Sequence, residues 1–489
     1  MYYFNNEIMQ LMLYNHKPLL LLAMLLSGIW SSNLYAQTGT GSISLEQAMQ
    51  LMLSNSDAIK QAHKGVEIAV IQKQRLNSAW FPNITATGGY LHMSNDIEAQ
   101  ESIGELLQPV AEAFPEIASI DGMSGILARL NTATLSFPLL DQDIGSMDGE
   151  IVWPLFSGGK RIWANRIGKS AIEYAQLVEQ WAEDNQSVLL TERYYTAKLT
   201  SEVVKVQWQN LASMEQLYSN ALKLMENGII NKAEMLVAKA AMQEAERELK
   251  SALNSDTLAI TALLSLIGGS SMDIELLTPF FIPASIPQKE YFKEKTSSNN
   301  PQLNMLKSQQ EIAGYNFKIA RSGYLPDVAI FGKQNICSYN IPKNLAPRTT
   351  VGAGFVWNIF DGLYRERSMQ IAKQEKQMLE LGSSRLSKEL DLLLDRLYAQ
   401  LCDLKNTLPT VNTTIQLAEE LVKIQEKSFG EGMATSLEVA NAHTLLAKTR
   451  TAAATIYCQY DIALAMLLAI TGESSSFLSC LAHADLFYN

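Results

Sequence analysis

The sequence predicts a mainly α-helical fold with a membrane β-barrel, to which each chain supplies long coiled-coil helices and four strands. Three observations predict this fold: an internal duplication, alternating apolar segments in each copy, and one very long helical stretch in each copy. The composition, with 47% hydrophobic and 18% charged residues among 489, is that of folded protein. The net charge of −11 argues against nucleic acid as a partner, because phosphate backbones are bound by clustered Lys and Arg and the sequence has no such cluster.

The N-terminus carries the pattern of a secretory signal peptide. His16 and Lys17 precede an apolar run from Leu19 to Ile29, and Ala36 then offers a small residue for cleavage. The alternative, a membrane anchor, needs roughly 20 apolar residues, and this run is shorter. We predict an exported chain with no transmembrane helix after its signal peptide. Such a chain is soluble in the periplasm, secreted, or inserted as a β-barrel.

Two copies of one unit make up the chain. The segment WPLFSG at residues 153–158 recurs as WNIFDG at residues 357–362, and NGI at 227–229 recurs as EGM at 431–433 with the same offset. The duplication divides the chain into a signal peptide (1–36), a first repeat (37–268), a linker (269–300), a second repeat (301–472) and a short C-terminal tail (473–489).

The first repeat carries an insertion at about residues 92–131, in the loop of its predicted β-hairpin. Its apolar residues fall at helical spacing, namely Ile103, Leu106, Leu107, Val110 and Phe114. We therefore predict a helical cap at the outer mouth of the barrel. A flexible loop is the alternative.

Each copy also contains a segment whose alternation predicts β-strands. Apolar residues alternate with small or polar ones over residues 351–359, and residues 150–155 match them in register. Two strands of about 10 residues in each copy have the length that a tilted strand needs to cross a bilayer. An apolar outer face with a polar inner face is typical of a membrane barrel. Trp153 and Trp357 would then lie at the lipid–water boundary; a small soluble sheet is the alternative.

A long helix follows the strands in each copy, from Gly159 to Glu226 and from Tyr364 to Gly430. Its apolar residues keep the narrow three–four spacing of a coiled-coil seam. At 1.5 Å per residue each helix would be about 100 Å long. The chain then turns at a glycine and returns through a shorter helix. Asn231-x-x-Glu234 and Thr435-x-x-Glu438 predict a capping box at the start of each returning helix.

Two further features concern the second long helix. Pro409 lies inside it and predicts a kink, because proline removes one backbone hydrogen bond. Cys402 and Cys458 are predicted at the same height on the two helices of this hairpin, in an oxidising compartment where a disulfide persists. We nevertheless expect two separate thiols, with the disulfide as the alternative, because helices packed about 8–10 Å apart exceed the roughly 4.4–6.8 Å between Cα atoms that a disulfide prefers.

Closing the barrel requires more than one chain, because four strands are fewer than the roughly eight of the smallest membrane barrels. A dimer would supply eight strands and a trimer twelve.

The motifs of this chain, in their order and their duplication, resemble those of the TolC family of outer-membrane efflux proteins. The resemblance rests on SLEQA at 44–48, PLFSGGK at 154–160, SLEV at 436–439 and TG at 471–472. The resemblance implies a homotrimer with a 12-stranded barrel, a periplasmic α-barrel, a periplasmic adaptor (membrane fusion) protein and an inner-membrane pump.

The resemblance also implies where the channel is gated. In the family, polar and aromatic residues near the glycine turns close the periplasmic tip, and the family's basic partner at the tip is replaced by Ala434 here. Carried over by position, the gate candidates are Glu234, Phe429, Glu438 and Asn441. The implied positions at the hairpin tips, where an adaptor would dock, are Gly228, Ile229, Gly432 and Met433.

Nothing in the sequence predicts an enzyme, a cofactor or a metal site. The five histidines are scattered without ligand spacing, and SGGK at 157–160 lacks the spacing of a phosphate-binding loop. The resemblance implies a passive exit duct of a tripartite efflux or type I secretion system, in the outer membrane and extending into the periplasm. It leaves the cargo open between drugs, metals and protein. The alternative function is a periplasmic coiled-coil scaffold without a pore.

Overall fold

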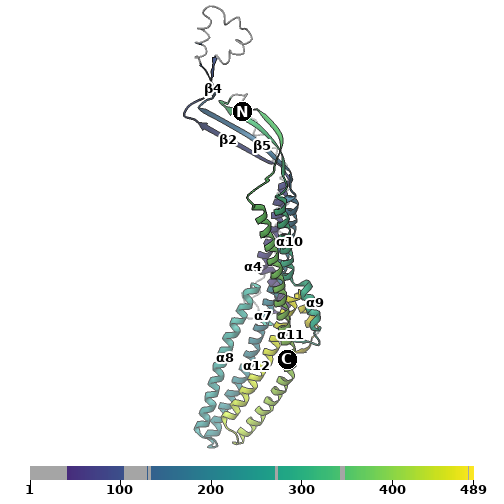
Figure 1. Cartoon of the computed structure of the whole chain (residues 1–489). Helices are drawn as coiled ribbons and strands as arrows, with labels where there is room; N and C mark the ends of the chain where they lie inside the picture. The colour runs from purple at the N-terminus through teal and green to yellow at the C-terminus, as the bar shows by residue number, and fades with distance from the viewer. Residues whose placement is uncertain are drawn as a thin grey trace, which may run out of the picture.

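The computed structural model describes residues 41–103, 129, 134–269, 274–341, 347–482 and 484–488. The predicted signal peptide and most of the predicted helical cap lie outside the described residues. The chain is elongated, with a β-sheet at one end and two helix hairpins that turn at the opposite end (Figure 1).

Two long helices run through most of this length. They are α7 (Lys160–Glu226) and α11 (Tyr364–Gly430), each of 67 residues, which corresponds to about 100 Å at 1.5 Å per residue. The prediction of both helices is confirmed at both ends to within one residue. The helix α11 continues through Pro409 without ending there.

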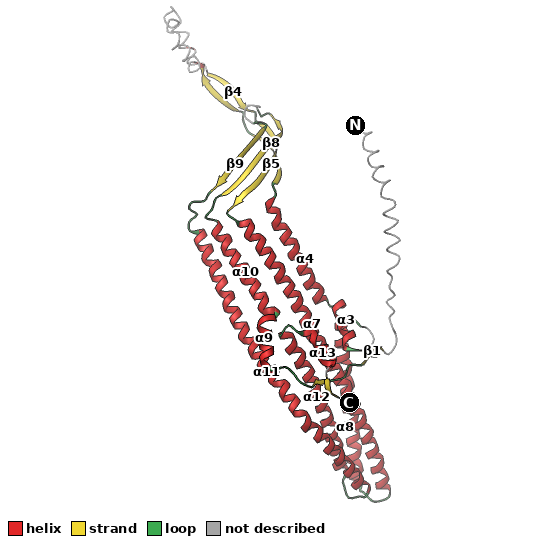
Figure 2. Ribbon diagram, turned by 90° about the vertical axis from the view of Figure 1, so that its right-hand side faces the viewer, coloured by secondary structure: helices red, strands yellow, loops and turns green. Residues whose placement is uncertain are grey.

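Shorter helices lie end to end beside the long ones (Figure 2). In the half next to the sheet, the lateral order is α4 (Asp57–Asn77), α7, α10 (Pro301–Ser322) and α11. In the other half it is α8 (Lys232–Ile267), α7, α12 (Ser436–Ile470) and α11. The chain therefore forms a single curved wall of four helices along its whole helical part.

The duplication begins earlier in the second copy than the sequence indicates. The helix α3 (Leu45–Asn55) precedes α4, and its counterpart α9 (Lys289–Asn299) lies inside the predicted linker. Asn55 Nδ2 donates to Ile267 O over 2.8 Å, and Asn300 Nδ2 donates to Ile470 O over 2.9 Å. In both copies the same hydrogen bond therefore joins the end of this short helix to the end of the returning helix. Proline-rich sequence suggested a linker, but Pro301 lies in the first turn of α10, where proline is favourable.

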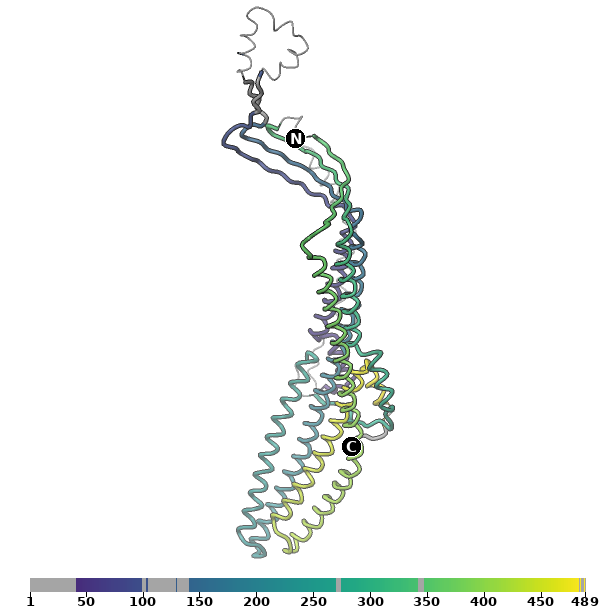
Figure 3. The backbone as a smooth tube through the Cα atoms, viewed as in Figure 1, coloured from purple at the N-terminus to yellow at the C-terminus, as the bar shows by residue number. Residues whose placement is uncertain are grey.

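Four antiparallel strands form the sheet, in the order β2 (Asn83–His92), β5 (Asp143–Ser157), β8 (Asp327–Tyr339) and β9 (Thr349–Val356). They have 10, 15, 13 and 8 residues. The prediction that Trp357 lies within a strand is wrong, because β9 ends at Val356 where the chain bends toward α11. A separate ribbon of β3 (Ile97–Ser102) and β4 (Thr134–Leu140) extends beyond the sheet, away from the helices (Figure 3).

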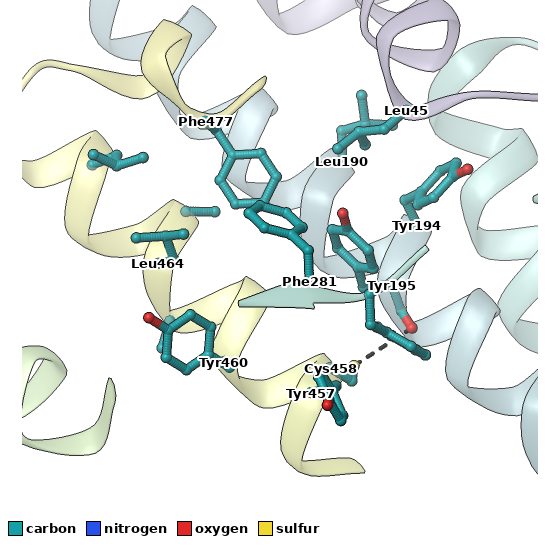
Figure 4. Packing of buried hydrophobic residues seen from close by; sticks show 14 of the residues in the cluster. Leu45, Leu190, Tyr194, Tyr195, Phe281, Tyr457, Cys458, Tyr460, Leu464 and Phe477 are labelled. Carbon is teal, nitrogen blue, oxygen red and sulfur yellow. Dashed lines mark hydrogen bonds between the residues drawn. The ribbon is translucent and has the colours of Figure 1, made fainter. Parts of the chain in front are cut away.

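The main core lies midway along the helices, where short elements wrap around them. The parallel pair β1 (Gly41–Ile43) and β6 (Ile274–Leu276) covers one side, and β7 (Phe281–Pro283) lies close to α12. Aromatic rings fill this core, among them those of Tyr194, Tyr195 and Phe281 (Figure 4). The Tyr195 ring stacks on that of Phe280 with centroids 5.5 Å apart. Tyr194 OH donates to Ile43 O and accepts from Thr278 N, each over 2.9 Å.

The C-terminal segment is folded, although the sequence predicts it only as a tail. It forms the short 3₁₀ turn η3 (Ser474–Ser476), α13 (Phe477–Ala482) and β10 (Ala484–Phe487), which pairs with β7. The Phe477 ring packs 5.4 Å from that of Phe281. Beside them Asp461 is fully buried and accepts a long hydrogen bond of 3.4 Å from Phe281 N. Burial raises the pKa of Asp461 well above that of an ordinary carboxyl group.

One described helix, α12, is long and apolar enough to cross a membrane by length and hydropathy alone. Of its most apolar stretch, however, 61% is buried inside the protein. Its alanines and leucines face α7, α11 and the central aromatic core. We therefore interpret α12 as the core helix of the wall.

Candidate functional site

The sheet has two faces of opposite character. One face, which we call the apolar face, carries large hydrophobic side chains that no other part of the described chain covers. It comprises Ile84, Tyr90, Met147, Ile151, Trp153, Ile330, Ile336, Val351 and Phe355. Val351 and Phe355 are 73% and 71% exposed. An exposed apolar surface of this extent marks contact with lipid or protein.

The polar face lies on the opposite side of the same strands. Lys333 Nζ forms an ion pair with Asp148 Oδ2 at 3.2 Å, and Asn335 Nδ2 donates to Asp148 Oδ1 over 2.9 Å. Thr85 and Glu150 pair directly in the register of β2 and β5. Strands with one apolar and one polar face are those of a membrane barrel that encloses water.

Each predicted interface tryptophan belongs to a larger arrangement at the junction of sheet and helices. Trp153 Nε1 donates to Trp80 O over 3.1 Å, and the Arg161 guanidinium lies 4.5 Å from the centre of the Trp80 ring. Arg161 also donates to Leu155 O over 2.7 Å. The indole ring of Trp153 stays 45% exposed on the apolar face.

The second copy repeats this junction. Trp357 Nε1 donates to Tyr324 O over 3.1 Å, and Arg365 lies 4.8 Å above the Tyr324 ring while donating to Ile359 O over 2.9 Å. Sequence reasoning missed both arginines. The repeat offset could have found them, because each arginine follows its tryptophan at the same distance in the chain. We expect the two junctions to fix the direction in which the helices leave the sheet.

The two hairpin tips lie side by side at the far end of the molecule. Gly228 and Gly432 have φ values of +71° and +75°, which favour glycine. A Cβ atom at Gly432 would lie 3.3 Å from Ile229 Cγ2, so the two turns are in contact. Ile229 and Met433 are 57% and 72% exposed.

The capping-box prediction is right in one copy and wrong in the other. Thr435 and Glu438 cap each other at the start of α12, and the N–H and hydroxyl of Thr435 hold the pKa of Glu438 below its usual range. In the first copy Asn231 accepts from Glu234 N, but the Glu234 carboxylate does not return to Asn231. Its Oε2 accepts from Ser436 N over 2.9 Å, so it caps the helix of the other hairpin.

The remaining gate candidates have different surroundings. Phe429 is only 3% exposed and packs with Val439 and residues of α7 and α8 in a small core between the hairpins. Asn441 is exposed and lines a groove of about 700 Å³ over α8 and α12, together with Leu437. The structure therefore brings Glu234 and the start of α12 together, and places Phe429 inside the wall.

Cys402 and Cys458 are both free thiols, so the disulfide alternative is wrong. The Cys458 thiol lies 3.4 Å from Tyr195 O on α7, turned toward the core (Figure 4). Burial raises its pKa to about 12, which leaves it unreactive at neutral pH. Within the described part of the chain, no group of three or more His, Cys, Asp or Glu residues is placed to hold a metal ion.

Comparison with known proteins agrees with this geometry. Residues 294–473 match the family model described as outer membrane efflux protein. No curated protein sequence matches the chain significantly. Three solved structures are similar to this chain. VceC from Vibrio cholerae is 16% identical, with 88% of this chain and 96% of that chain covered and a TM-score of 0.68, and CusC is 12% identical, with 87% and 91% covered and a TM-score of 0.68. The open state of MtrE from Neisseria gonorrhoeae is 13% identical, with 88% of this chain and 89% of that chain covered and a TM-score of 0.65.

These likenesses cover both repeats, and at such low identity they establish the fold, an α-barrel joined to a β-barrel. The family match covers the second repeat. Members of this family are passive channels and not enzymes. The second repeat thus matches the outer membrane efflux protein family, and the described chain shares the fold of the outer-membrane channels to which it is similar.

Proposed function

We propose that three copies of this chain close into one tube, with a 12-stranded barrel in the outer membrane and a helical tunnel in the periplasm. The observation that carries this proposal is the open sheet. Within the described residues β2 and β9 are edge strands with no partner on their outer sides. An unpaired edge in a membrane is costly, so β9 of one copy would pair with β2 of the next.

The edges of the helical wall support the same assembly. On α11 a row of apolar side chains stays uncovered, namely Ile371, Met378, Leu381 and Leu392, which are 59–74% exposed. On the opposite edge, Ile71 of α4 is 62% exposed and Leu258 of α8 is 71% exposed. When two different edges of a chain both have exposed apolar side chains, one edge can pack against the other edge of the next copy in a head-to-tail interface. Such an interface closes into a ring when the rotation between neighbouring copies divides a full turn evenly.

At the tip, the proposed gate is the contact between the two hairpins. Glu234 makes this contact by capping α12 of the other hairpin. Phe429 stabilises it from the small core between the hairpins, and Glu438 stabilises the start of α12. Opening would separate the hairpins and break the Glu234 contact. The exposed Ile229 and Met433 at the turns would meet the periplasmic adaptor, through which an inner-membrane pump delivers its cargo.

The alternative, a periplasmic scaffold without a pore, leaves the apolar face unexplained. A scaffold in water would have no use for side chains such as Val351 and Phe355, which remain exposed on a sheet that nothing else covers. The polar face would have no water-filled space to line. We therefore favour the channel.

A pair of neighbouring substitutions tests the proposal. Val351→Lys places a charge on the apolar face, at a cost of about 2–4 kcal/mol near the middle of a bilayer. Thr350→Lys is its matched control on the polar face, beside a Lys333 that Asp148 already neutralises. We expect Val351→Lys to deplete the heat-resistant oligomer from outer-membrane fractions and Thr350→Lys to preserve it. Equal recovery of both variants would contradict the barrel.

A further inference from the structure

The polar face carries a hollow of about 580 Å³ near the helix end of the sheet. Side chains of Val152, Pro154, Phe331 and Val356 line it. Phe331 lies against β9, since a Cβ atom at Gly352 would come within 2.6 Å of its ring. The ring is held in place and remains 37% exposed toward the hollow. An apolar surface thus interrupts a face that is otherwise polar.

Charged groups surround this hollow, and all but one are paired. Lys160 Nζ lies 3.2 Å from Asp327 Oδ2 at one end, and Lys333 Nζ lies 3.2 Å from Asp148 Oδ2 at the other. Glu150 also lines the hollow, and within the described chain its carboxylate has no hydrogen bond or ion pair, since Lys333, opposite it in the register of β5 and β8, is paired with Asp148. The charged groups therefore leave one uncompensated negative charge in each copy.

We propose that this hollow is a contact site for cationic amphiphiles, small organic molecules with an apolar body and a permanent positive charge. The inference rests on the proposed function, because the polar face must line the barrel. The apolar floor would cover the body of such a molecule. Glu150 would attract its charge, and the exposed face of Phe331 suits a quaternary ammonium group.

Other cargoes fit the hollow less well. A bare metal ion would find one free carboxylate and an apolar floor, which is no coordination site. An anionic amphiphile would meet the unpaired Glu150. A folded protein cannot enter a hollow of about 580 Å³. The site is open and shallow, so it holds its ligand weakly, as an exit duct requires.

Current block in planar bilayers tests the inference on the purified full-length protein. Tetrapentylammonium is added on the side of the extracellular loops, from which it reaches the barrel without passing the helical tip, and decanesulfonate is tested in parallel. We expect tetrapentylammonium to interrupt the potassium chloride current at a lower concentration than decanesulfonate. Glu150→Gln should raise its blocking concentration about threefold to tenfold, from the loss of one nearby charge. Phe331→Leu should raise it too, because the leucine keeps the apolar floor but lacks the aromatic face.

Asp141→Asn is the matched control, since it removes an exposed carboxylate just outside the sheet strands. We expect it to leave the block by tetrapentylammonium unchanged. Equal block by both ions, or an unchanged block in Glu150→Gln, would overturn the contact site while the channel stands. A protein that inserts but carries no current, even when Glu234→Ala removes the proposed gate contact, would overturn the proposed function together with it.

Discussion

Removing the Glu234 side chain should favour the open channel. Glu234 Oε2 accepts a hydrogen bond of 2.9 Å from Ser436 N, at the first turn of α12. Hydrogen bonds to charged groups contribute about 1.5–3 kcal/mol, and a carboxylate at a helix N-terminus gains about 0.3–1 kcal/mol from the dipole. Because Glu234 is half-buried, we expect about 1 kcal/mol per chain. Three chains acting together would shift the equilibrium by about 3 kcal/mol, more than a hundredfold.

Single-channel recording of the purified protein measures this shift. Glu234→Ala should raise the fraction of time spent in the open state, and Glu234→Gln should lie between it and the unmodified protein, because an amide oxygen still accepts but carries no charge. Glu431→Ala is the matched control, since this exposed carboxylate sits at the same tip and forms no hydrogen bond within the described chain. An open fraction for Glu234→Ala equal to that of Glu431→Ala would refute the reasoning.

Three further predictions follow from the core, the junctions and α11. Because burial raises the pKa of Asp461, the protonated side chain contributes fully to the stability of the folded state below about pH 4, and this contribution is lost as pH rises through the raised pKa. Asp461→Asn should therefore raise the thermal midpoint at pH 7, with a gain that shrinks toward pH 4; a gain independent of pH would contradict this. Trp153→Phe combined with Trp357→Phe should cost about 1 kcal/mol per lost hydrogen bond in thermal unfolding, whereas Trp208→Phe on α7, which is 55% exposed, should cost little. Pro409→Ala should stabilise α11 by up to about 3 kcal/mol and reduce adaptor-dependent export, and unchanged export would show that Pro409 is not a hinge.

The periodicity of apolar residues in the sequence was sufficient to predict the long helices. The ends of α7 and α11 follow from local signals, namely the glycines after each strand and at each hairpin turn. The alternation around Trp153 likewise predicts which residues share the apolar face. Trp357 was misplaced because alternation continues past β9, although the chain has already left the sheet to reach Tyr324.

Contacts between segments that are distant in the chain could not be predicted from the local sequence. Glu234 fits a capping box in its own helix, and nothing in its neighbourhood reveals that Ser436 of the other hairpin offers the better donor. The burial of Phe429 depends on how the two hairpins pack together. The folding of the C-terminal segment depends on β7, about 200 residues earlier in the chain. Such pairings arise from the tertiary fold, and a single sequence carries no local trace of them.

Native mass spectrometry of the full chain, extracted from outer membranes in mild detergent, tests the central claim most directly. The open edges β2 and β9, together with the uncovered apolar side chains on α11, α4 and α8, require a closed assembly, and we propose that it contains three chains. A mass that corresponds to three chains, lost when Val351→Lys disrupts the apolar face, would support the account. A mass of one or two chains, from protein that still conducts ions in bilayers, would contradict it.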